Sequence, residues 1–284
     1  MQINGETLVY GILGYPVRHS KSPIFQTEAF QALGINAVYL PFHVKPEDLE
    51  KAVEGIRALS IKGVNITVPH KEEVIKYVNE ISEEVKYIGA ANTIENVDGY
   101  LKAYNTDAYG FIRGLKELLS KAGKEIQDLK FLVIGAGGAS RAVLYGLVKE
   151  GAEFILVANR TVSKALKITE DFKNLNRFIE EIVIPIHLND IEKYLKDVDV
   201  IVNTTSVGLK EEDKELFDYE KIMKKHIIVD IIYKRTKLLR KAEEKGCLWQ
   251  DGLPMLLYQG AKAFEIWTKK EAPVELMRKV LEEK

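Results

Sequence analysis

The sequence predicts an α/β protein with two domains. Its 284 residues are enough for two cores of ordinary domain size. Apolar strand-like runs alternate with helical patterns along the chain, which is typical of α/β folds. In the later half, these runs are apolar without alternation, as in a parallel sheet that is covered on both faces.

The composition excludes several kinds of partner. A net charge of −1 and a pI near 6.6 argue against nucleic acid or a membrane bound through bulk charge, so we expect a small-molecule substrate. Cys247 is the single cysteine, which rules out a disulfide framework and a thiolate cluster. The histidines show no ligand spacing, so we predict no metal.

The chain also lacks the features of an exported or membrane protein. Residues 1–6 have neither the basic start nor the apolar run of a signal peptide. No apolar run approaches the ~18 residues of a membrane span. We therefore expect a cytoplasmic protein.

The first domain is predicted from alternating elements that begin at Leu8. The expected strands are Leu8–Gly14, Ala37–Val44, Gly63–Val68 and Ala91–Asn96. Helical patterns are expected from Ser22 to Gly34, from Pro46, from Glu72 to Val78 and from Ser82 to Ile88.

The second domain is predicted to follow a helix over Ala108–Leu119. Its expected strands are Phe131–Ile134, Glu153–Ala158, Ile182–Ile186, Val198–Asn203 and Ile227–Ile231. We expect no further strand, so the last helical patterns, Met255–Trp267 and Val274–Glu283, should return to the first domain. The predicted boundaries are 1–105 completed by 253–284 for the first domain, and 106–252 for the second.

The stretch from Phe131 to Arg141 predicts a dinucleotide-binding unit. An apolar strand leads through Gly135 and Gly137 into a helix, and a second strand follows in βαβ order. The glycines let the backbone approach a pyrophosphate, and the helix N–H groups provide an anion site. Ser140 replaces the third glycine of the common fingerprint. The alternative is an ordinary glycine-rich turn without a ligand.

The end of the second strand of this unit distinguishes NADP from NAD. An NAD site usually has Asp or Glu about 20 residues after the glycines, to bind the ribose 2′-hydroxyl. This chain has Asn159, Arg160 and Thr161, with Lys164 one turn further on. Two cationic side chains favour a 2′-phosphate and therefore NADP. The alternative is a solvated basic helix start that Thr161 caps.

Polar residues of the first domain are candidates for substrate binding and catalysis. Ser20 and Ser22 lie at a helix start, where both hydroxyls can donate to a carboxylate; alternatively, Ser22 only caps the helix. Thr67 lies on a strand, and Lys71 follows the proline that ends it, at the edge where α/β sites lie. The alternative for Lys71 is a surface lysine.

Asp107 has two interpretations. It begins a helix and is therefore typical of an N-cap. As a carboxylate near Lys71, it would complete a pair that passes a proton between a substrate oxygen and water. The sequence spacing does not decide between them.

Later polar stretches are candidates for a cofactor cleft. Residues 203–208 follow a buried strand, and Tyr233 offers a hydroxyl after the next strand. Met255 and Gln259 lie one helical turn apart on one face. For each stretch, plain loop or core packing is the alternative.

Taken in order, these stretches are similar to those of the shikimate dehydrogenase family along nearly the whole chain. Each is ordinary alone, but their order and joint presence are specific. The matching stretches are Ser20–Pro23, Asn65–Lys71, Gly89–Thr93, Asn105–Asp107, Gly135–Ser140, Asn159–Thr161, Asn203–Thr205 and Gly252–Gln259. The resemblance implies reversible NADP-dependent reduction of 3-dehydroshikimate to shikimate, in the pathway to aromatic amino acids. It also implies an N-terminal substrate domain, a Rossmann-type doubly wound NADP domain, and C-terminal helices that return to the first domain.

The resemblance also implies residue roles. Lys71 and Asp107 would be the catalytic pair that handles the proton. Ser20, Ser22 and Tyr233 would bind the substrate carboxylate, and Thr67, Asn92 and Gln259 its hydroxyls. The cofactor-binding residues would be Gly135, Ala136, Gly137, Gly138, Ala139, Asn159, Arg160, Thr161, Lys164, Thr204, Ser206, Gly252 and Met255. Among these, Arg160 and Lys164 would hold the 2′-phosphate and Met255 would pack near the nicotinamide. We expect a monomer or a homodimer.

Some positions depart from the family pattern, and rival functions remain. Gln26 and Thr27 stand where many relatives have His-Asn, and Ser206 and Lys234 stand where proline is frequent. The rivals are a dehydrogenase that also takes quinate and can use NAD, a non-catalytic sensor of NADP or shikimate, and a folate dehydrogenase on the same plan.

Overall fold

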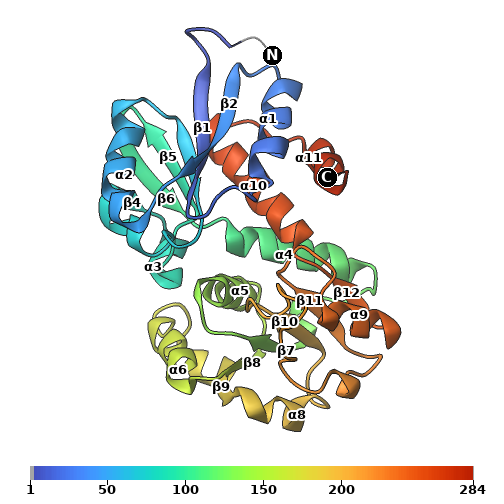
Figure 1. The fold of residues 1–284 in the computed structure, drawn as a ribbon. Helices are drawn as coiled ribbons and strands as arrows, with labels where there is room; N and C mark the ends of the chain where they lie inside the picture. Colours follow the sequence, from blue (N-terminus) through green and yellow to red (C-terminus); the bar gives the residue numbers. More distant parts are fainter. Residues whose placement is uncertain (1–2, 284) are drawn as a thin grey trace. The chain divides into compact units, whose positions relative to one another are not determined.

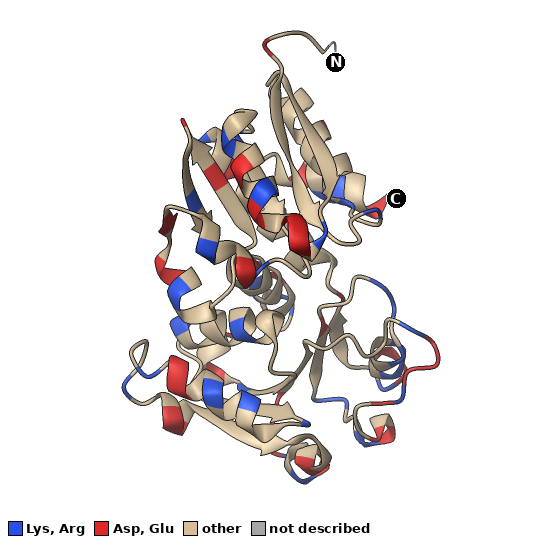
Figure 2. Ribbon diagram, turned by 60° about the vertical axis from the view of Figure 1, so that its left-hand side comes forward, with Lys and Arg blue, Asp and Glu red and all other residues tan. Residues whose placement is uncertain are grey.

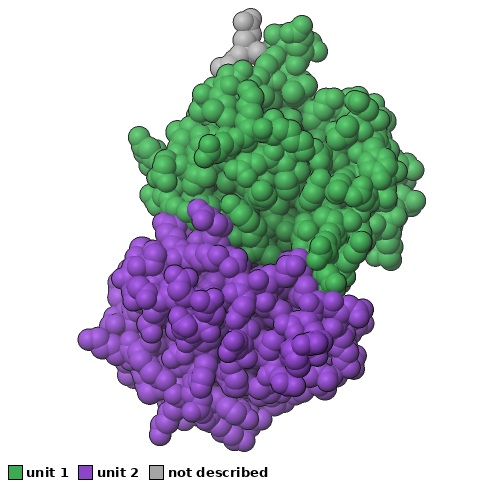
Figure 3. Space-filling view, turned by 180° about the vertical axis from the view of Figure 1, so that it is seen from behind, with its two compact units in different colours: residues 1–110, 257–284 green, residues 111–256 purple. Residues whose placement is uncertain are grey.

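The computed structural model describes residues 3–283 and divides them into two compact units. The first unit contains the described residues up to 110 and those from 257 onward, and the second contains residues 111–256 (Figure 3). Two helices carry the chain between the units, α4 (Asp107–Ser120) and α10 (Leu253–Thr268). Among the described residues, no helix is both long and apolar enough to cross a membrane.

The first unit is built on a six-stranded sheet with the order β2-β1-β3-β5-β6-β4 (Figure 1). Its strands are β1 (Leu8–Gly14), β2 (Ala37–His43), β3 (Gly63–Ile66), β4 (Glu80–Ile81), β5 (Thr93–Val97) and β6 (Tyr100–Tyr104). Its other helices are α1 (Ser22–Ala32), α2 (Leu49–Ala58), α3 (Glu83–Ile88) and α11 (Val274–Glu282), with 3-10 turns η1 (Pro46–Asp48) and η2 (Glu73–Tyr77). Within this sheet β5 runs against its neighbours, because it pairs antiparallel with both β3 and β6.

Alternation along β1 builds a core on each face of this sheet. The ring of Tyr10 stacks on Phe30 of α1 and lies beside Trp267 of α10. Leu13 belongs to a separate buried cluster with Val53 of α2. Successive side chains of a strand point to opposite faces, so helices are required on both sides. Figure 1 shows α1, α10 and α11 together on one side of the sheet.

The second unit has the strand order of a doubly wound nucleotide-binding fold. The order is β12-β11-β10-β7-β8-β9, and every neighbouring pair is parallel. The strands are β7 (Lys130–Ile134), β8 (Phe154–Asn159), β9 (Val183–His187), β10 (Val200–Asn203), β11 (Ile227–Asp230) and β12 (Leu248–Gln250). The helices are α5 (Gly138–Lys149), α6 (Val162–Asp171), α7 (Ile179–Ile182), α8 (Ile191–Tyr194) and α9 (Lys237–Glu244), with 3-10 turns η3 (Ile126–Asp128), η4 (Leu188–Asp190) and η5 (Tyr219–Lys221).

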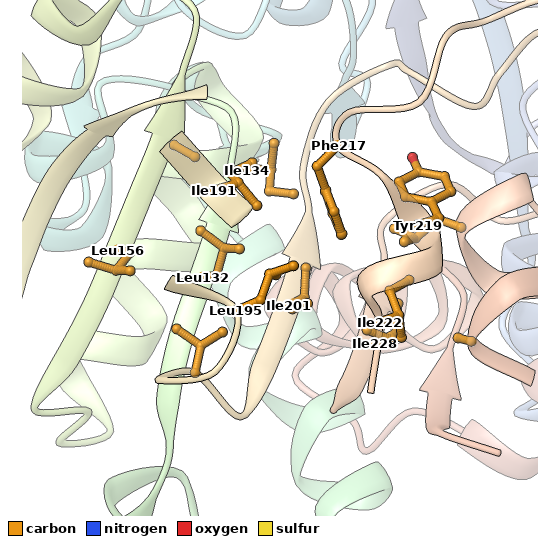
Figure 4. Close-up of a cluster of buried hydrophobic side chains, with 14 of the residues drawn as sticks. Leu132, Ile134, Leu156, Ile191, Leu195, Ile201, Phe217, Tyr219, Ile222 and Ile228 are labelled. Atoms are coloured by element: carbon orange, nitrogen blue, oxygen red, sulfur yellow. The ribbon is translucent and has the colours of Figure 1, made fainter. Parts of the chain in front are cut away.

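One face of the second sheet is covered by a continuous apolar cluster (Figure 4). Leu132 of β7 and Ile201 of β10 contribute to this cluster from the sheet. Leu195, after α8, and Leu239 of α9 contribute to it from the covering segments. Burying each such side chain stabilises the fold by roughly 1.5–3 kcal/mol. The predicted α/β class with a doubly wound second domain is confirmed.

The charged side chains are distributed differently from the buried apolar residues. Figure 2 shows Lys and Arg interspersed with Asp and Glu over the helices and loops, while the strands of the second sheet are mostly uncharged. This mixture agrees with the net charge of −1.

Several elements differ from the sequence-based expectations. The expectation that no strand follows Ile231 is wrong, because β12 pairs in parallel with β11 at the edge of the second sheet. A strand of three partly buried residues shows no alternation that a sequence pattern could reveal. The strands β4 and β6 were not predicted either, and the helical pattern from Glu72 folds as a 3-10 helix.

Candidate active site

A lysine and an aspartate meet in the first unit. The Lys71 Nζ atom lies 2.6 Å from the Asp107 Oδ2 atom, as in a charge-assisted hydrogen bond. The Asp107 side chain is 11% exposed and that of Lys71 is 30% exposed, so the carboxylate is held inside while the ammonium keeps access to solvent. Lys71 follows β3 and Asp107 begins α4, and the fold brings these distant segments together. The plain surface interpretation of Lys71 is therefore wrong.

Asn92 fixes the other oxygen of this carboxylate. Its Nδ2 atom donates to Asp107 Oδ1 at 2.9 Å and to Thr106 Oγ1 at 3.0 Å. Its Oδ1 atom accepts from the Thr106 backbone N–H at 2.7 Å. The Asp107 backbone N–H donates to the Asn105 side chain at 3.1 Å. Because Asn92 is 2% exposed and bonded through both ends of its amide, the orientation of Asp107 is set before any ligand arrives.

Gln259 of α10 joins this cluster. Its Oε1 atom lies 3.4 Å from Asn92 Nδ2, which is the longest of the three contacts of that nitrogen. Gln259 is 8% exposed. A long contact is the weakest of the three, so it is the one that a ligand hydroxyl can replace at least cost.

The two serines lie at the start of α1. Ser22 is the first residue of that helix and is buried, while Lys21 occupies the N-cap position, so the interpretation of Ser22 as a simple cap is wrong. The Ser20 Oγ atom accepts from the Ser22 backbone N–H at 3.2 Å. Burial raises the pKa of Tyr39 well above its ordinary value, and the hydroxyl of Ser22 bonds to Tyr39 and opposes this rise.

Thr67 lies directly after β3 and packs on the end of β1. Its backbone N–H donates to the Leu13 carbonyl at 2.9 Å. A Cβ at Gly14 would collide with the methyl group of Thr67, so glycine is required there for Thr67 to hold its position. Tyr233 and Met255 belong to the second unit, where the Tyr233 side chain is 46% exposed.

A network that the sequence did not predict runs beneath these residues. The Tyr39 hydroxyl donates to Asn65 Oδ1 at 2.7 Å. The Asn65 Nδ2 atom donates to the Asn92 carbonyl and to Thr93 Oγ1, both at 3.1 Å. The alternation of Asn65 and Thr67 along β3 was the available signal, whereas nothing in the sequence marked Tyr39.

In the second unit, the glycine turn lies at the switch point of the sheet. The strand order reverses between β7 and β10, where ligands bind in doubly wound folds. Gly135 has φ +117°, and a Cβ there would lie 2.6 Å from Thr204 Oγ1, so glycine is required. Ser140, in place of the third glycine, donates to the Gly135 carbonyl at 2.7 Å and ties the helix start to the turn.

This turn fits a pyrophosphate. A Cβ built on Gly137 or Gly138 meets no atom within 4 Å, so open space lies beside the start of α5. The helix begins at Gly138, where free N–H groups and the helix dipole favour an anion. Ala136 and Ala139 are partly exposed at the same place.

The end of β8 fits an additional phosphate. Arg160 and Lys164 are exposed, and in the described part of the chain neither side chain is held in an ion pair. The Asn159 side chain donates to the Thr161 carbonyl at 2.8 Å and shapes the turn. Thr161 occupies the N-cap position of α6, but its side chain forms no cap bond, so the capping interpretation is wrong.

The remaining cofactor candidates lie on neighbouring segments of the second unit. Thr204 donates its hydroxyl to the Ile134 carbonyl at 2.7 Å, and Ser206 is exposed two residues later. Gly252 donates its N–H to the Ile232 carbonyl at 3.1 Å, and a Cβ at this position would collide with the Ile231 carbonyl. Met255 follows at the start of α10.

A doubly wound unit with a pyrophosphate turn and a basic strand end, in one chain with a partly buried Lys–Asp pair, is typical of the class of nicotinamide-dependent dehydrogenases. Comparisons of the sequence and the structure with known proteins narrow this class to one family. The family described as the shikimate dehydrogenase substrate binding domain matches residues 12–94, the shikimate/quinate 5-dehydrogenase family matches residues 117–236, and the shikimate 5′-dehydrogenase C-terminal domain matches residues 252–282. The chain belongs to the shikimate dehydrogenase family.

Individual relatives cover the chain almost completely. The NADP(+) shikimate dehydrogenase of Aquifex aeolicus is 50% identical over 95% of each chain. A shikimate dehydrogenase solved in complex with NADP+ is 38% identical, with a TM-score of 0.91 over 99% of this chain and 97% of that one. The quinate dehydrogenase of Corynebacterium glutamicum, solved with NAD, is 29% identical, with a TM-score of 0.89 over 98% of this chain and 99% of that one.

Proposed function

We propose that this protein is an NADP-dependent shikimate dehydrogenase that reversibly reduces 3-dehydroshikimate to shikimate, with Lys71 and Asp107 handling the proton. The single observation that carries the chemistry is the 2.6 Å contact between Lys71 Nζ and Asp107 Oδ2. A sensor that only bound its ligands would need neither a proton donor nor a carboxylate to orient it.

The Lys–Asp pair suits the reduction of a carbonyl. Hydride for the carbonyl carbon of the substrate would come from bound reduced nicotinamide. Negative charge then develops on the substrate oxygen, and the Lys71 ammonium stabilises this charge and donates a proton to the oxygen. Asp107 holds the ammonium in place, while Asn92 prevents the carboxylate from turning.

The substrate groups are assigned to the polar side chains around this pair. Ser20 and Ser22 donate to the substrate carboxylate, which carries charge that two hydroxyls and a helix start can stabilise. Tyr233 of the second unit donates a third hydroxyl to it. Thr67, Asn92 and Gln259 bind the substrate hydroxyls, with Gln259 replacing its long contact to Asn92.

The residues that we assign to the cofactor all belong to the second unit. Residues 135–139 contact the pyrophosphate, and residues 159–161 with Lys164 hold the adenosine ribose and its 2′-phosphate. Thr204 and Ser206 line the nicotinamide side together with Gly252 and Met255.

The boundaries that we propose between the substrate domain and the NADP domain are those predicted from the sequence. Residues 1–105 and 253–284 form the substrate domain, and residues 106–252 form the NADP domain. Each boundary falls at the start of a helix that carries the chain between the compact units, α4 or α10. The enzyme acts in the cytoplasm as a monomer or a homodimer, and sedimentation at several concentrations would detect a larger assembly.

The test is an absorbance assay at the nicotinamide band with shikimate or quinate and with NADP or NAD. Reduction of NADP by shikimate is expected to be fastest, and Lys71→Ala is expected to lower kcat by roughly 100- to 10,000-fold. Lys76→Ala is the matched control, because Lys76 is an exposed lysine that pairs with Glu73 of its own turn. Faster turnover of quinate with NAD, or no turnover at all, would refute the proposal in favour of a rival.

A further inference from the structure

Asp230 is a buried carboxylate to which the proposed function gives no role. It is the last residue of β11 and is 0% exposed. A buried carboxylate is costly unless several donors converge on it, so its retention in a fold calls for a reason.

Donors from three segments converge on this carboxylate. Asn203 Nδ2, at the end of β10, donates to Asp230 Oδ1 at 3.1 Å. The Ile232 backbone N–H, in the loop after β11, donates to the same oxygen at 3.1 Å. The Thr236 hydroxyl, at the N-cap of α9, donates to Asp230 Oδ2 at 2.8 Å. The carboxylate therefore joins the ends of two parallel strands to the start of a helix.

Asn203 extends this connection into the loop after β10. Besides Asp230, its Nδ2 atom donates to the Val207 carbonyl at 3.1 Å. Its Oδ1 atom accepts from the Thr205 backbone N–H at 3.0 Å and from the Thr205 hydroxyl at 2.8 Å. The amide thus braces residues 204–207, which include the cofactor candidates Thr204 and Ser206.

Ile232 extends the connection toward Gly252. Its N–H binds Asp230, and its carbonyl accepts from the Gly252 N–H at 3.1 Å. Tyr233, the substrate candidate of this unit, is the next residue. One carboxylate therefore supports the backbone of the loop that carries Tyr233 and the segment against which Gly252 packs.

We propose that Asp230 is a positioning residue that sets the NADP-binding loops after β10 and β11 and the position of Tyr233. This inference rests on the proposed function, because the residues that it positions are those assigned to cofactor and substrate there. Asp230 acts through these residues and touches neither ligand.

The energetics of the carboxylate agree with a role other than stability. Burial raises the pKa of the Asp230 carboxyl, while its three donors oppose the rise. With the folded pKa above the unfolded one, the charged group costs stability at neutral pH, and the cost disappears as the pH falls below the unfolded value. Asparagine in place of Asp230 would avoid this cost. Its amide N–H would then face Thr236, however, and the threonine hydroxyl would lose its acceptor.

The test is a fluorescence titration of the full-length protein with NADPH, without substrate. Asp230→Ala removes the acceptor of all three donors and is expected to raise the NADPH dissociation constant about 10-fold or more. Asp230→Asn keeps an oxygen for Asn203 and Ile232 and is expected to restore binding to within about 3-fold of the wild type. In steady-state kinetics, Asp230→Ala should also raise the KM for shikimate, because Tyr233 moves, with a smaller change in kcat.

Leu195→Ala is the matched control. Leu195 is a buried member of the apolar cluster of the same unit and lies outside the Asp230 connection (Figure 4). Its truncation lowers the melting temperature by loss of packing but should leave NADPH affinity unchanged. Equal NADPH affinity in Asp230→Ala and Leu195→Ala would overturn the proposal, because the carboxylate would then be only structural.

A second variant covers the case in which Asp230→Ala does not fold. Thr236→Val removes one of the three donors and is expected to weaken NADPH binding about 3-fold. Wild-type affinity in this variant would likewise contradict the proposal. Failure of the proposed function is distinguishable, because the wild-type protein itself would then not reduce NADP with shikimate, whatever the NADPH affinity of the variants.

Discussion

The two units solve the problem of binding charge in opposite ways. In the first unit, Lys71, Asn92 and Asp107 come from segments far apart in the sequence, and the carboxylate and amide are buried. In the second unit, Arg160 and Lys164 lie within one helical turn of each other and are exposed. A proton must be delivered along a defined direction, which requires a rigid and partly buried environment, whereas a phosphate needs only positive charge within reach.

This difference sets the size of the effects that substitutions should have. In a buried network, one lost partner leaves other polar groups without bonds and without water. At an exposed site, water replaces the lost partner and salt screens the remaining charge. Substitutions in the network of the first unit should therefore cost more than those at the basic strand end.

The largest effect is expected for Asp107→Asn. This change removes the charge that holds the Lys71 ammonium, so kcat should fall by roughly 100- to 10,000-fold while NADPH affinity stays unchanged. Steady-state kinetics with an NADPH titration measures both. Asp190→Asn is the control, because Asp190 forms an exposed ion pair with Lys193. A kcat near the wild-type value would remove Asp107 from the chemistry.

A large loss of stability is expected for Asn92→Ala. The Thr106 N–H and the Asp107 carboxylate each lose a buried bond, so the free energy of unfolding should fall by roughly 2–5 kcal/mol. Denaturant unfolding measures it, and kcat should fall as well. Asn36→Ala, which removes a partly exposed amide that donates to Asn4 and accepts from Thr7, should cost much less stability. Similar stability losses in the two variants would show that the network does not act as a unit.

A moderate effect is expected for Arg160→Ala. Loss of one exposed charged contact should raise the KM for NADPH roughly 10-fold and leave the KM for NADH unchanged. Because the site is exposed, the difference between variant and wild type should shrink at high salt. Lys167→Ala is the control, because Lys167 is also exposed and lies on α6, the helix that follows Arg160. An equal rise in both KM values would mean that Arg160 does not bind the 2′-phosphate.

The smallest effect is expected for Glu220→Gln, which removes a fully exposed charge. Lys241 and Lys245 lower the pKa of Glu220 from 4.5 to about 2. Because the folded pKa is depressed, the stabilisation is present above about 4.5 and is lost as the pH falls toward about 2. The melting temperature at pH 7 should fall by less than about 3 °C, and the difference should vanish in acid. A constant difference across this range would argue against an ionic origin.

Local sequence patterns were enough to predict most of the fold and the identity of the cofactor. Apolar runs, helix starts and the glycine turn are signals within a few consecutive residues, and they predicted two α/β domains of which the second is doubly wound. The strand β12 and the 3-10 helix after Lys71 escaped prediction, because they are too short for a period to appear. The basic residues after β8 indicated NADP without any tertiary information, because their interpretation depends only on charge at a strand end.

The sequence by itself determined the order of elements, the pyrophosphate turn, and the residue types of the candidate site, because each of these is a property of neighbouring residues. It left Asp107 open between a helix cap and the partner of Lys71, and it gave no reason to single out Tyr39. The tertiary structure alone decided that Lys71 meets Asp107, that Asn92 locks the carboxylate, and that Asp230 joins three segments. Such contacts depend on the register of strands and on buried hydrogen bonds between distant segments, and these leave no local pattern in the chain.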